Sequence, residues 1–364
     1  MKTVITIVGT SLFTNYQHPD VRSLINILYN NKYIDISTDM EVLTDRPADQ
    51  MNSFQGYCQT IEKAIKRFWL KNISRTASHP YWQAASGNQP NLDACAELTS
   101  TGKIARELKE DLQVHLLATD TILSCLAAKI LRDNFADISF GSFSAKFLFN
   151  PEQDVIKNLQ VYNRQNFSRH GLRLLVQRLM SVIESCGGNC VLNITGGYKA
   201  IIPYLTIIGQ VNSIPIYYIF EESSELIALP QVPLTIDWHF MGKYAKEFSQ
   251  LAEAGTDQSS AYSYQFRQEC ASCLEEEDHM LALSPLGELL WKKSQEKYFF
   301  FYAPDKVWEE IQSQPDILRI IRQKLPVYIA QKNKTEKKAN GHLVYDDGSN
   351  PYRINYFVEK GSIY

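Results

Sequence analysis

Short runs of consecutive apolar residues alternate, over the first 235 positions, with stretches in which apolar residues recur every three or four positions. Four of the runs predict buried strands, at residues 4–8, 114–118, 190–194 and 214–220. The periodic stretches predict helices, over residues 54–70, 119–131, 172–183 and 199–209. Strands that alternate with helices are typical of a mostly parallel sheet covered by helices on both faces. The predicted fold class is therefore α/β.

Two segments interrupt this alternation. Residues 74–91 are polar and contain two prolines and a glycine, which predicts a loop. Residues 230–233 begin and end with proline and leave the pattern of strands and helices. We expect a domain boundary there, which defines a first domain of residues 1–235.

The remaining chain divides into two parts. Residues 236–296 are mainly helical, and the pair Ser284-Pro285 is typical of a helix N-terminus, which predicts a helix over residues 286–293. The elements predicted in residues 297–364 are an aromatic strand at 298–302, a helix at 305–324, a lysine-rich segment, and a hairpin of strands 342–346 and 352–358. A third strand begins at Ser362 and stops at Tyr364, so we expect the natural sheet to continue beyond that residue.

The net charge of the chain is −3, from 37 basic and 40 acidic side chains, and this average alone argues against a nucleic-acid ligand. The charge is unevenly distributed, however. Residues 1–237 carry 21 basic and 22 acidic side chains, residues 238–296 carry 5 and 10, and residues 297–364 carry 11 and 8. A polyanion would bind best to the last part, where seven basic residues lie between Arg319 and Lys338. The acidic middle part is predicted to be a spacer or a protein-binding module and not a DNA reader.

Other classes of protein are disfavoured by the sequence. No apolar run reaches the roughly 18 residues that span a bilayer, and the N-terminus lacks the features of a signal peptide, so we expect a cytoplasmic protein. The seven cysteines include a single Cys-x-x-Cys pair, Cys270 and Cys273. A structural zinc needs four ligands, so neither a metal nor a resident cofactor is predicted.

Loops at the carboxyl ends of the predicted strands have the composition of a binding site. The turn at 195–199 combines two glycines, a lysine and the start of a helix, which suits an anion. The hydroxyls that follow the first strand suit a phosphate or a ribose, and they could instead cap a helix. Thr119 and Asp120, which follow the strand at 114–118, could likewise line a binding site or cap a helix. Because these loops share one edge of the sheet, we expect one pocket lined by Thr10, Ser11, Thr119, Thr195, Gly196, Gly197 and Lys199.

The Thr-Ser turn after the first strand and the late Thr-Gly-Gly-x-Lys turn resemble the CARF domain, the CRISPR-associated Rossmann-fold sensor of cyclic oligoadenylates. The resemblance covers about residues 1–235. It implies a Rossmann-like homodimer whose two crevices join into one ring-shaped site, with the seven residues above contacting the ring. Cyclic tetra-adenylate is the ring that the family implies. Some CARF domains also cleave the ring, so a ring-nuclease activity stays open.

The basic end of the chain carries a second resemblance. A helix followed by a hairpin with Tyr352-Arg353 at the head of a strand resembles RelE-type mRNA interferases, small α+β domains that cleave mRNA in the ribosomal A site without metal. In-line attack by a ribose 2′-OH needs a base, an acid and cations near the phosphate. The resemblance makes Arg353 a catalytic candidate, and His342 stands where the family often has a lysine pair. The lysines just upstream are the remaining candidates, namely Lys332, Lys334, Lys337 and Lys338.

The middle part, residues 236–296, resembles a winged helix-turn-helix module. The whole chain is thus similar to the CARF–winged-helix–RelE fusions, the CRISPR-Cas-associated mRNA interferases. The implied function is a ribonuclease of type III CRISPR defence that a cyclic oligoadenylate activates, with the ribosome and mRNA as partners and residues 297–364 as the catalytic domain. Two alternatives stay open: a ligand-controlled transcriptional regulator, and a stand-alone ring nuclease.

Overall fold

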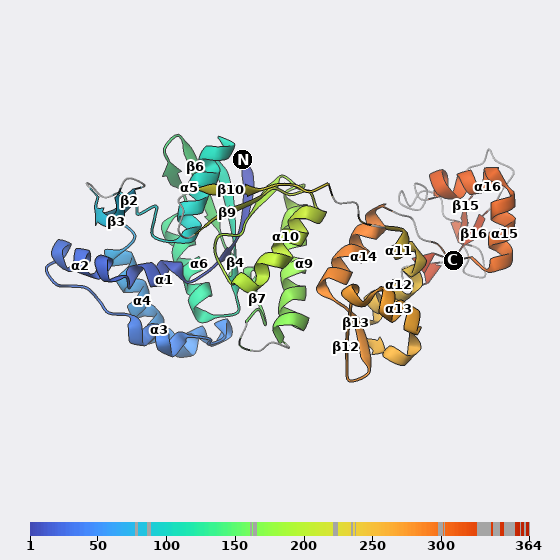
Figure 1. Cartoon of the computed structure of the whole chain (residues 1–364), viewed down its shortest axis with the longest axis horizontal. Helices are drawn as coiled ribbons and strands as arrows, with labels where there is room; N and C mark the ends of the chain where they lie inside the picture. Colours follow the sequence, from blue (N-terminus) through green and yellow to red (C-terminus); the bar gives the residue numbers. More distant parts are fainter. Residues whose placement is uncertain are drawn as a thin grey trace. The chain divides into compact units, whose positions relative to one another are not determined.

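The computed structural model folds into two compact units, Met1–Leu234 and Thr235–Tyr364 (Figure 1). The structure describes residues 1–76, 79–85, 89–160, 162, 166–220, 225–233, 236, 238–297, 301, 303–325, 336–337, 343–345, 354–356, 358–359 and 362–363. The second unit contains two separate hydrophobic clusters, one within residues 241–291 and one within 311–356. The division of the chain into three domains stays a prediction.

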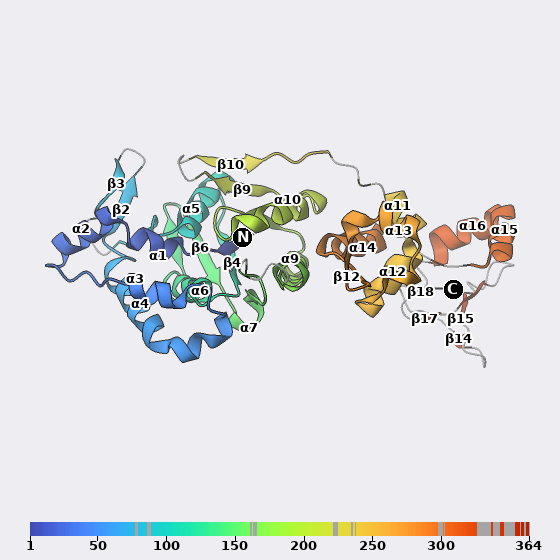
Figure 2. The same ribbon diagram turned by 60° about the horizontal axis from the view of Figure 1, so that its bottom comes forward.

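A mixed sheet of eight strands forms the centre of the first unit (Figures 1 and 2). Seven strands follow the order β10-β9-β8-β1-β4-β6-β5, and β7 pairs with the end of β4. Their bounds are β1 (Lys2–Val8), β4 (Leu112–Thr119), β5 (Ile138–Phe140), β6 (Phe143–Leu148), β7 (Val155–Ile156), β8 (Cys190–Asn193), β9 (Ile216–Ile219) and β10 (Leu226–Leu229). The central pairs are parallel, and β5 and β10 are antiparallel to their neighbours. The predicted α/β class with a mostly parallel sheet is confirmed.

Helices cover both faces of this sheet. They are α5 (Ala96–Leu108), α6 (Ile122–Asn134), α7 (Pro151–Asp154), η2 (Phe167–Gly171), α9 (Leu172–Ser185), η3 (Lys199–Ile201) and α10 (Ile202–Val211). Alternate residues of a strand point to opposite faces. Val4 and Val114 therefore pack in the cluster that holds the buried sides of α5 and α6, whereas His115 contacts Arg178 of α9. Within the described ranges, no helix is long and apolar enough to cross a membrane.

A buried carboxylate ties β4 to α7 and α9. Asp154 Oδ1 lies 2.9 Å from His115 Nε2 and accepts hydrogen bonds of 2.9 and 2.7 Å from the Arg178 guanidinium. Asp154 Oδ2 accepts the Asn150 N–H at 2.6 Å. Burial by itself raises the pKa of Asp154, but the hydrogen bonds from His115, Asn150 and Arg178 outweigh it and hold the pKa below its ordinary value. The carboxylate is therefore charged in the folded protein and stabilises it.

A long insertion separates β1 from α5. It consists of α1 (Ser11–Tyr16), α2 (Pro19–Leu28), α3 (Ser37–Leu43), η1 (Ala48–Phe54), α4 (Gln55–Phe68), β2 (Ile73–Thr76) and β3 (His79–Ala84). The predicted helix over 54–70 is confirmed as α4. The predicted loop over 74–91 is wrong, because β2 and β3 form an antiparallel hairpin. Tertiary packing holds this polar hairpin: the Trp82 ring lies 4.8 Å from the buried Trp69 ring, and Arg75 stacks on Trp82.

The second unit begins with a helical part that also contains a small sheet of order β11-β13-β12. Its elements are α11 (Trp238–Lys243), α12 (Ala245–Ala254), β11 (Asp257–Gln258), η4 (Ser259–Ala261), α13 (Tyr264–Glu269), η5 (Ala271–Cys273), β12 (Leu274–Glu277), β13 (Met280–Leu283) and α14 (Pro285–Lys297). The three glutamates of β12 do not predict a strand, because glutamate has low strand propensity. The hairpin forms because Asp278 and His279 both adopt positive φ, as a tight hairpin turn requires.

Local sequence signals did predict the start of α14. Ser284 accepts the Gly287 N–H through its hydroxyl at 3.1 Å, and Pro285 is the first helical residue. The helix extends four residues beyond the predicted end at 293. Gly287 also permits close packing, because a Cβ there would lie 2.1 Å from the Cys273 carbonyl oxygen.

The end of the chain has short helices and a small antiparallel sheet. The elements are α15 (Asp305–Ser313), α16 (Pro315–Arg319), η6 (Ile320–Lys324), β14 (Glu336–Lys337), β15 (Leu343–Tyr345), β16 (Ile354–Tyr356), β17 (Val358–Glu359) and β18 (Ser362–Ile363). The single helix predicted over 305–324 breaks at Gln314, whose backbone is extended because Pro315 follows it. The predicted hairpin is confirmed in its described part, where β15 and β16 pair. Most of the strand predicted at 298–302 lies outside the described residues.

Candidate functional site

The loops that follow the central strands meet at one edge of the sheet. Strand β1 lies between β4 and β8, and the chain moves from β1 to one side of the sheet and later returns to the other. Ligands of open α/β sheets bind at such a switch point, outside the carboxyl ends of the strands. The loop after β1 contacts the loop after β8 closely, because a Cβ on Gly9 would lie 3.0 Å from the Gly197 nitrogen. We call the space outside these loops the crevice.

The turn after β8 has the geometry of an anion site. Thr195 anchors it: its N–H donates to Asn193 Oδ1 at 3.2 Å, and its Oγ1 accepts the Ile219 N–H at 3.1 Å. Across the described residues, the N–H groups of Gly196, Gly197 and Tyr198 donate to no protein acceptor. The exposed Lys199 follows directly as the first residue of η3. Unpaired N–H groups beside a lysine are what a phosphate needs.

Both glycines of this turn are required by the packing. Gly197 has φ +85°, and a Cβ there would lie 2.7 Å from Ile7 Cγ2. A Cβ on Gly196 would lie 2.8 Å from the Ile7 carbonyl oxygen. The turn is therefore pressed against the end of β1, and only glycine permits this approach.

The Ser11 hydroxyl after β1 is engaged by the protein, and the Thr10 hydroxyl caps no helix. Ser11 Oγ accepts the Ala96 N–H at 3.0 Å and donates to Glu97 Oε2 at 3.2 Å. Of the two interpretations of Ser11, the structure therefore supports helix capping, although the helix is α5 and not the adjacent α1. Thr10 precedes α1, is half-buried and caps no helix through its side chain.

Thr119 is the last residue of β4 and does not reach the surface. It is buried, its N–H donates to Ser124 Oγ at 3.0 Å, and its Oγ1 lies 3.2 Å from Thr121 Oγ1. The Tyr198 phenol hydrogen-bonds to Thr119 and Thr121, and burial raises the pKa of Tyr198 above its usual value. The N-cap of α6 is Thr121, which accepts the Ser124 N–H, so the cap predicted at Thr119-Asp120 was displaced by one or two residues.

Most catalytic candidates of the basic end of the chain lie outside the described residues. They are Lys332, Lys334, Lys338, His342 and Arg353. Lys337 belongs to β14, where its backbone pairs with Leu343. Their catalytic roles stay predictions.

Sequence reasoning missed Glu97, the acidic residue nearest the loop contact. It lies in the first turn of α5, is 1% exposed, and Oε1 accepts the Gly9 N–H at 2.8 Å. The available signal was that Glu97 directly precedes a stretch, Leu98 to Ala105, whose buried residues are small or apolar. A carboxylate on such a buried helix face needs a hydrogen-bond partner, because an unpartnered carboxylate is rarely buried.

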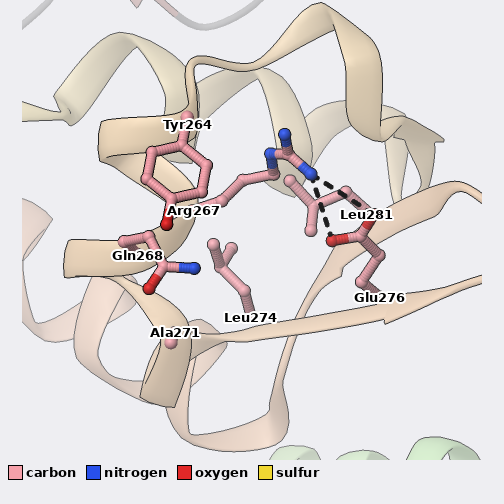
Figure 3. A pocket seen from close by; sticks show the side chains of 7 residues that line it. All are labelled: Tyr264, Arg267, Gln268, Ala271, Leu274, Glu276 and Leu281. Carbon is pink, nitrogen blue, oxygen red and sulfur yellow. Dashed lines mark hydrogen bonds and ion pairs between the residues drawn. The ribbon is translucent and has the colours of Figure 1, made fainter.

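A cavity of about 240 Å³ in the second unit lies between α13 and the β12–β13 hairpin (Figure 3). Tyr264 and Gln268 line it from α13, and Leu281 lines it from β13. Arg267 bonds to the Glu276 carboxylate across it at 3.5 Å, so the basic and acidic charges of the lining offset each other. This surface does not have the positive charge that a nucleic-acid contact needs.

The first unit is thus an α/β domain whose sheet has a switch point beside the turn at 195–199. Residues 92–232 match the sequence model of a family described as CRISPR-associated protein (Cas_APE2256). This range includes Glu97, β4, β8 and the turn at 195–199, and it is less than half of the chain. No curated protein matches the chain. Among solved structures, Can2 from Sulfobacillus thermosulfidooxidans in complex with cyclic tetra-adenylate is 11% identical, with 69% of this chain and 68% of that chain covered and a TM-score of 0.19.

Proposed function

We propose that the first unit is a CARF-type sensor of the CRISPR system and that its crevice binds a cyclic oligoadenylate. The observation that carries this proposal is the turn at Gly196–Tyr198, whose N–H groups have no protein acceptor within the described residues, beside the exposed Lys199. This turn lies within the range that matches a CRISPR-associated family. Phosphates of the ring would accept from these N–H groups and from the lysine.

The proposed ligand is cyclic tetra-adenylate, and the proposed assembly is a homodimer. A ring with repeated phosphates presents the same group to each copy of the turn. Two crevices facing one another would then bind one ring with twofold symmetry.

Replacing Lys199 by alanine is expected to weaken binding of cyclic tetra-adenylate about 10- to 100-fold, because a hydrogen bond to a charged group contributes about 1.5–3 kcal/mol. Titration calorimetry on the whole chain measures the affinity. Lys146→Ala is the matched control, because Lys146 is exposed on β6 and should leave the affinity unchanged. Absence of ring binding by the unaltered protein, or equal affinity of the Lys199 variant, would refute the proposal.

We further infer that residues 297–364 form a ribonuclease domain that the sensor controls. The support is a small α+β arrangement: α15 and α16 share a hydrophobic cluster with β15 and β16. The β15–β16 ladder pairs Leu343 with Tyr356 and Tyr345 with Ile354. Arg353 directly precedes β16 in the chain, in the part that carries the excess of basic side chains.

Arg353→Ala is expected to lower the rate of mRNA cleavage at saturating RNA at least 100-fold in the ring-bound protein, because a cation at the phosphorane is removed. Single-turnover cleavage on ribosomes measures this rate. Arg319→Ala, an exposed arginine of α16, should weaken RNA association but leave the saturated rate unchanged. Equal cleavage by the Arg353 variant would exclude its catalytic role. Release of linear oligoadenylate without mRNA cleavage would indicate a ring nuclease.

A further inference from the structure

The Glu97 carboxylate occupies the position in the first loop where a phosphate would be expected. In α/β domains, the backbone N–H groups that follow the first strand are common phosphate donors. Here the Gly9 N–H already donates to Glu97 Oε1 at 2.8 Å, and the Ser11 hydroxyl donates to Oε2 at 3.2 Å. Two donors that this loop could offer to an anion, the Gly9 N–H and the Ser11 hydroxyl, are therefore engaged by Glu97.

Glu97 also contacts the turn after β8. A Cβ on Gly196 would lie 2.5 Å from Glu97 Oε1, so the carboxylate is in direct contact with the turn. The Gly9 N–H and the Ser11 hydroxyl are neutral donors, and they leave the negative charge of the carboxylate in place. A phosphate bound at Gly196 and Gly197 thus has a fixed negative charge on its β1 side.

We propose that Glu97 is an internal anion that determines specificity: the Gly196–Lys199 turn binds one phosphate of a ligand, and the Glu97 charge excludes a second phosphate from the neighbouring β1 loop. The crevice then selects phosphodiesters whose phosphates are separated by nucleosides, and it disfavours a polyphosphate such as that of ATP. The identity of the ring ligand rests on the proposed function. The position of the Glu97 carboxylate in the β1 loop does not depend on that function.

The first test compares two ligands with two variants. Glu97→Gln keeps the shape of the side chain and the acceptor for Gly9 but removes the charge. The affinity of this variant for ATP should rise about tenfold, and its affinity for cyclic tetra-adenylate should rise less. The affinity for cyclic tetra-adenylate divided by the affinity for ATP therefore falls. Glu110→Gln is the control, because Glu110 is exposed just before β4, at the opposite edge of the sheet, and should change neither affinity. An unchanged ratio in the Glu97 variant, measured by calorimetry, would overturn the proposal.

The second test needs no nucleotide. Glu97→Ala leaves the Gly9 N–H and the Ser11 hydroxyl without an acceptor, so acetate should fill the space and raise the Tm above that in sodium chloride of equal ionic strength. Neither the unaltered protein nor the Glu97→Gln variant should respond to acetate. Failure of acetate to raise the Tm of a folded alanine variant would overturn the proposal. If that variant does not fold, the ATP affinity of Glu97→Gln decides. If acetate raises the Tm of Glu97→Ala but the unaltered protein does not bind the ring, the proposed ligand is refuted and the role of Glu97 is not.

Discussion

Replacing Gly197 by alanine is expected to destabilise the first unit by about 2–4 kcal/mol and to abolish binding of the proposed ring ligand. Gly197 has φ +85°, a conformation that costs an L-residue about 1–2 kcal/mol. The added methyl group would also lie 2.7 Å from Ile7 Cγ2, in a packed interior that resists such an overlap. The turn must move, and its N–H groups are displaced with it. Urea denaturation and ring titration measure the two effects.

Gly187→Ala provides a matched control in the turn just before β8. Gly187 also has positive φ, +58°, but no atom lies within 4 Å of the position of its Cβ. This variant should lose only about 1 kcal/mol and should retain ring binding. Equal losses in the two variants would show that the contact with Ile7 does not hold the turn in place.

Asp154→Ala is expected to lower the free energy of unfolding by about 3–5 kcal/mol, because it removes one partner of a buried ion pair. The Asp154 side chain is 2% exposed and that of Arg178 is 20% exposed, so water can replace the lost interactions only in part. Asp133→Ala is the control, since the Arg132–Asp133 pair, at 2.7 Å, is 35% and 44% exposed. The control should lose less than about 1 kcal/mol. A similar loss in both variants, measured by chemical denaturation, would contradict the assigned role.

The same carboxylate predicts the direction of an acid effect. Because the pKa of Asp154 is lower in the folded protein than its ordinary value of 3.8, the unfolded chain binds the proton more readily. Its contribution is complete above the unfolded pKa and is lost as the pH falls below about 4 through the folded pKa. The difference in stability between the unaltered protein and Asp154→Ala should therefore shrink at low pH. A difference that stays constant down to pH 2 would exclude a charged Asp154 as its source.

The central strands and most of the helices around them could be predicted because their signals are local. A buried strand is a short apolar run, and a helix that packs on a sheet has an apolar face, so β1, β4, β8 and β9 are visible in the sequence. The N-cap at Ser284 is equally local. The hairpins β2–β3 and β12–β13 were missed because β2–β3 is largely polar and β12 contains three consecutive glutamates, although β13 is apolar. Packing of Trp82 on Trp69, and the turn at Asp278 and His279, stabilise them.

By itself, the sequence determined the α/β class, the position of the Gly-Gly turn at the end of a buried strand, and the unequal distribution of charge among the parts of the chain. These properties depend on composition and short spacing alone. Only the tertiary structure decided which protein groups the candidate residues contact. Ser11 and Gly9 bond to Glu97, 86 and 88 positions later in the chain, and Thr119 is buried. Such partners meet because helices and loops pack on the sheet, and short-range sequence patterns carry no record of that packing.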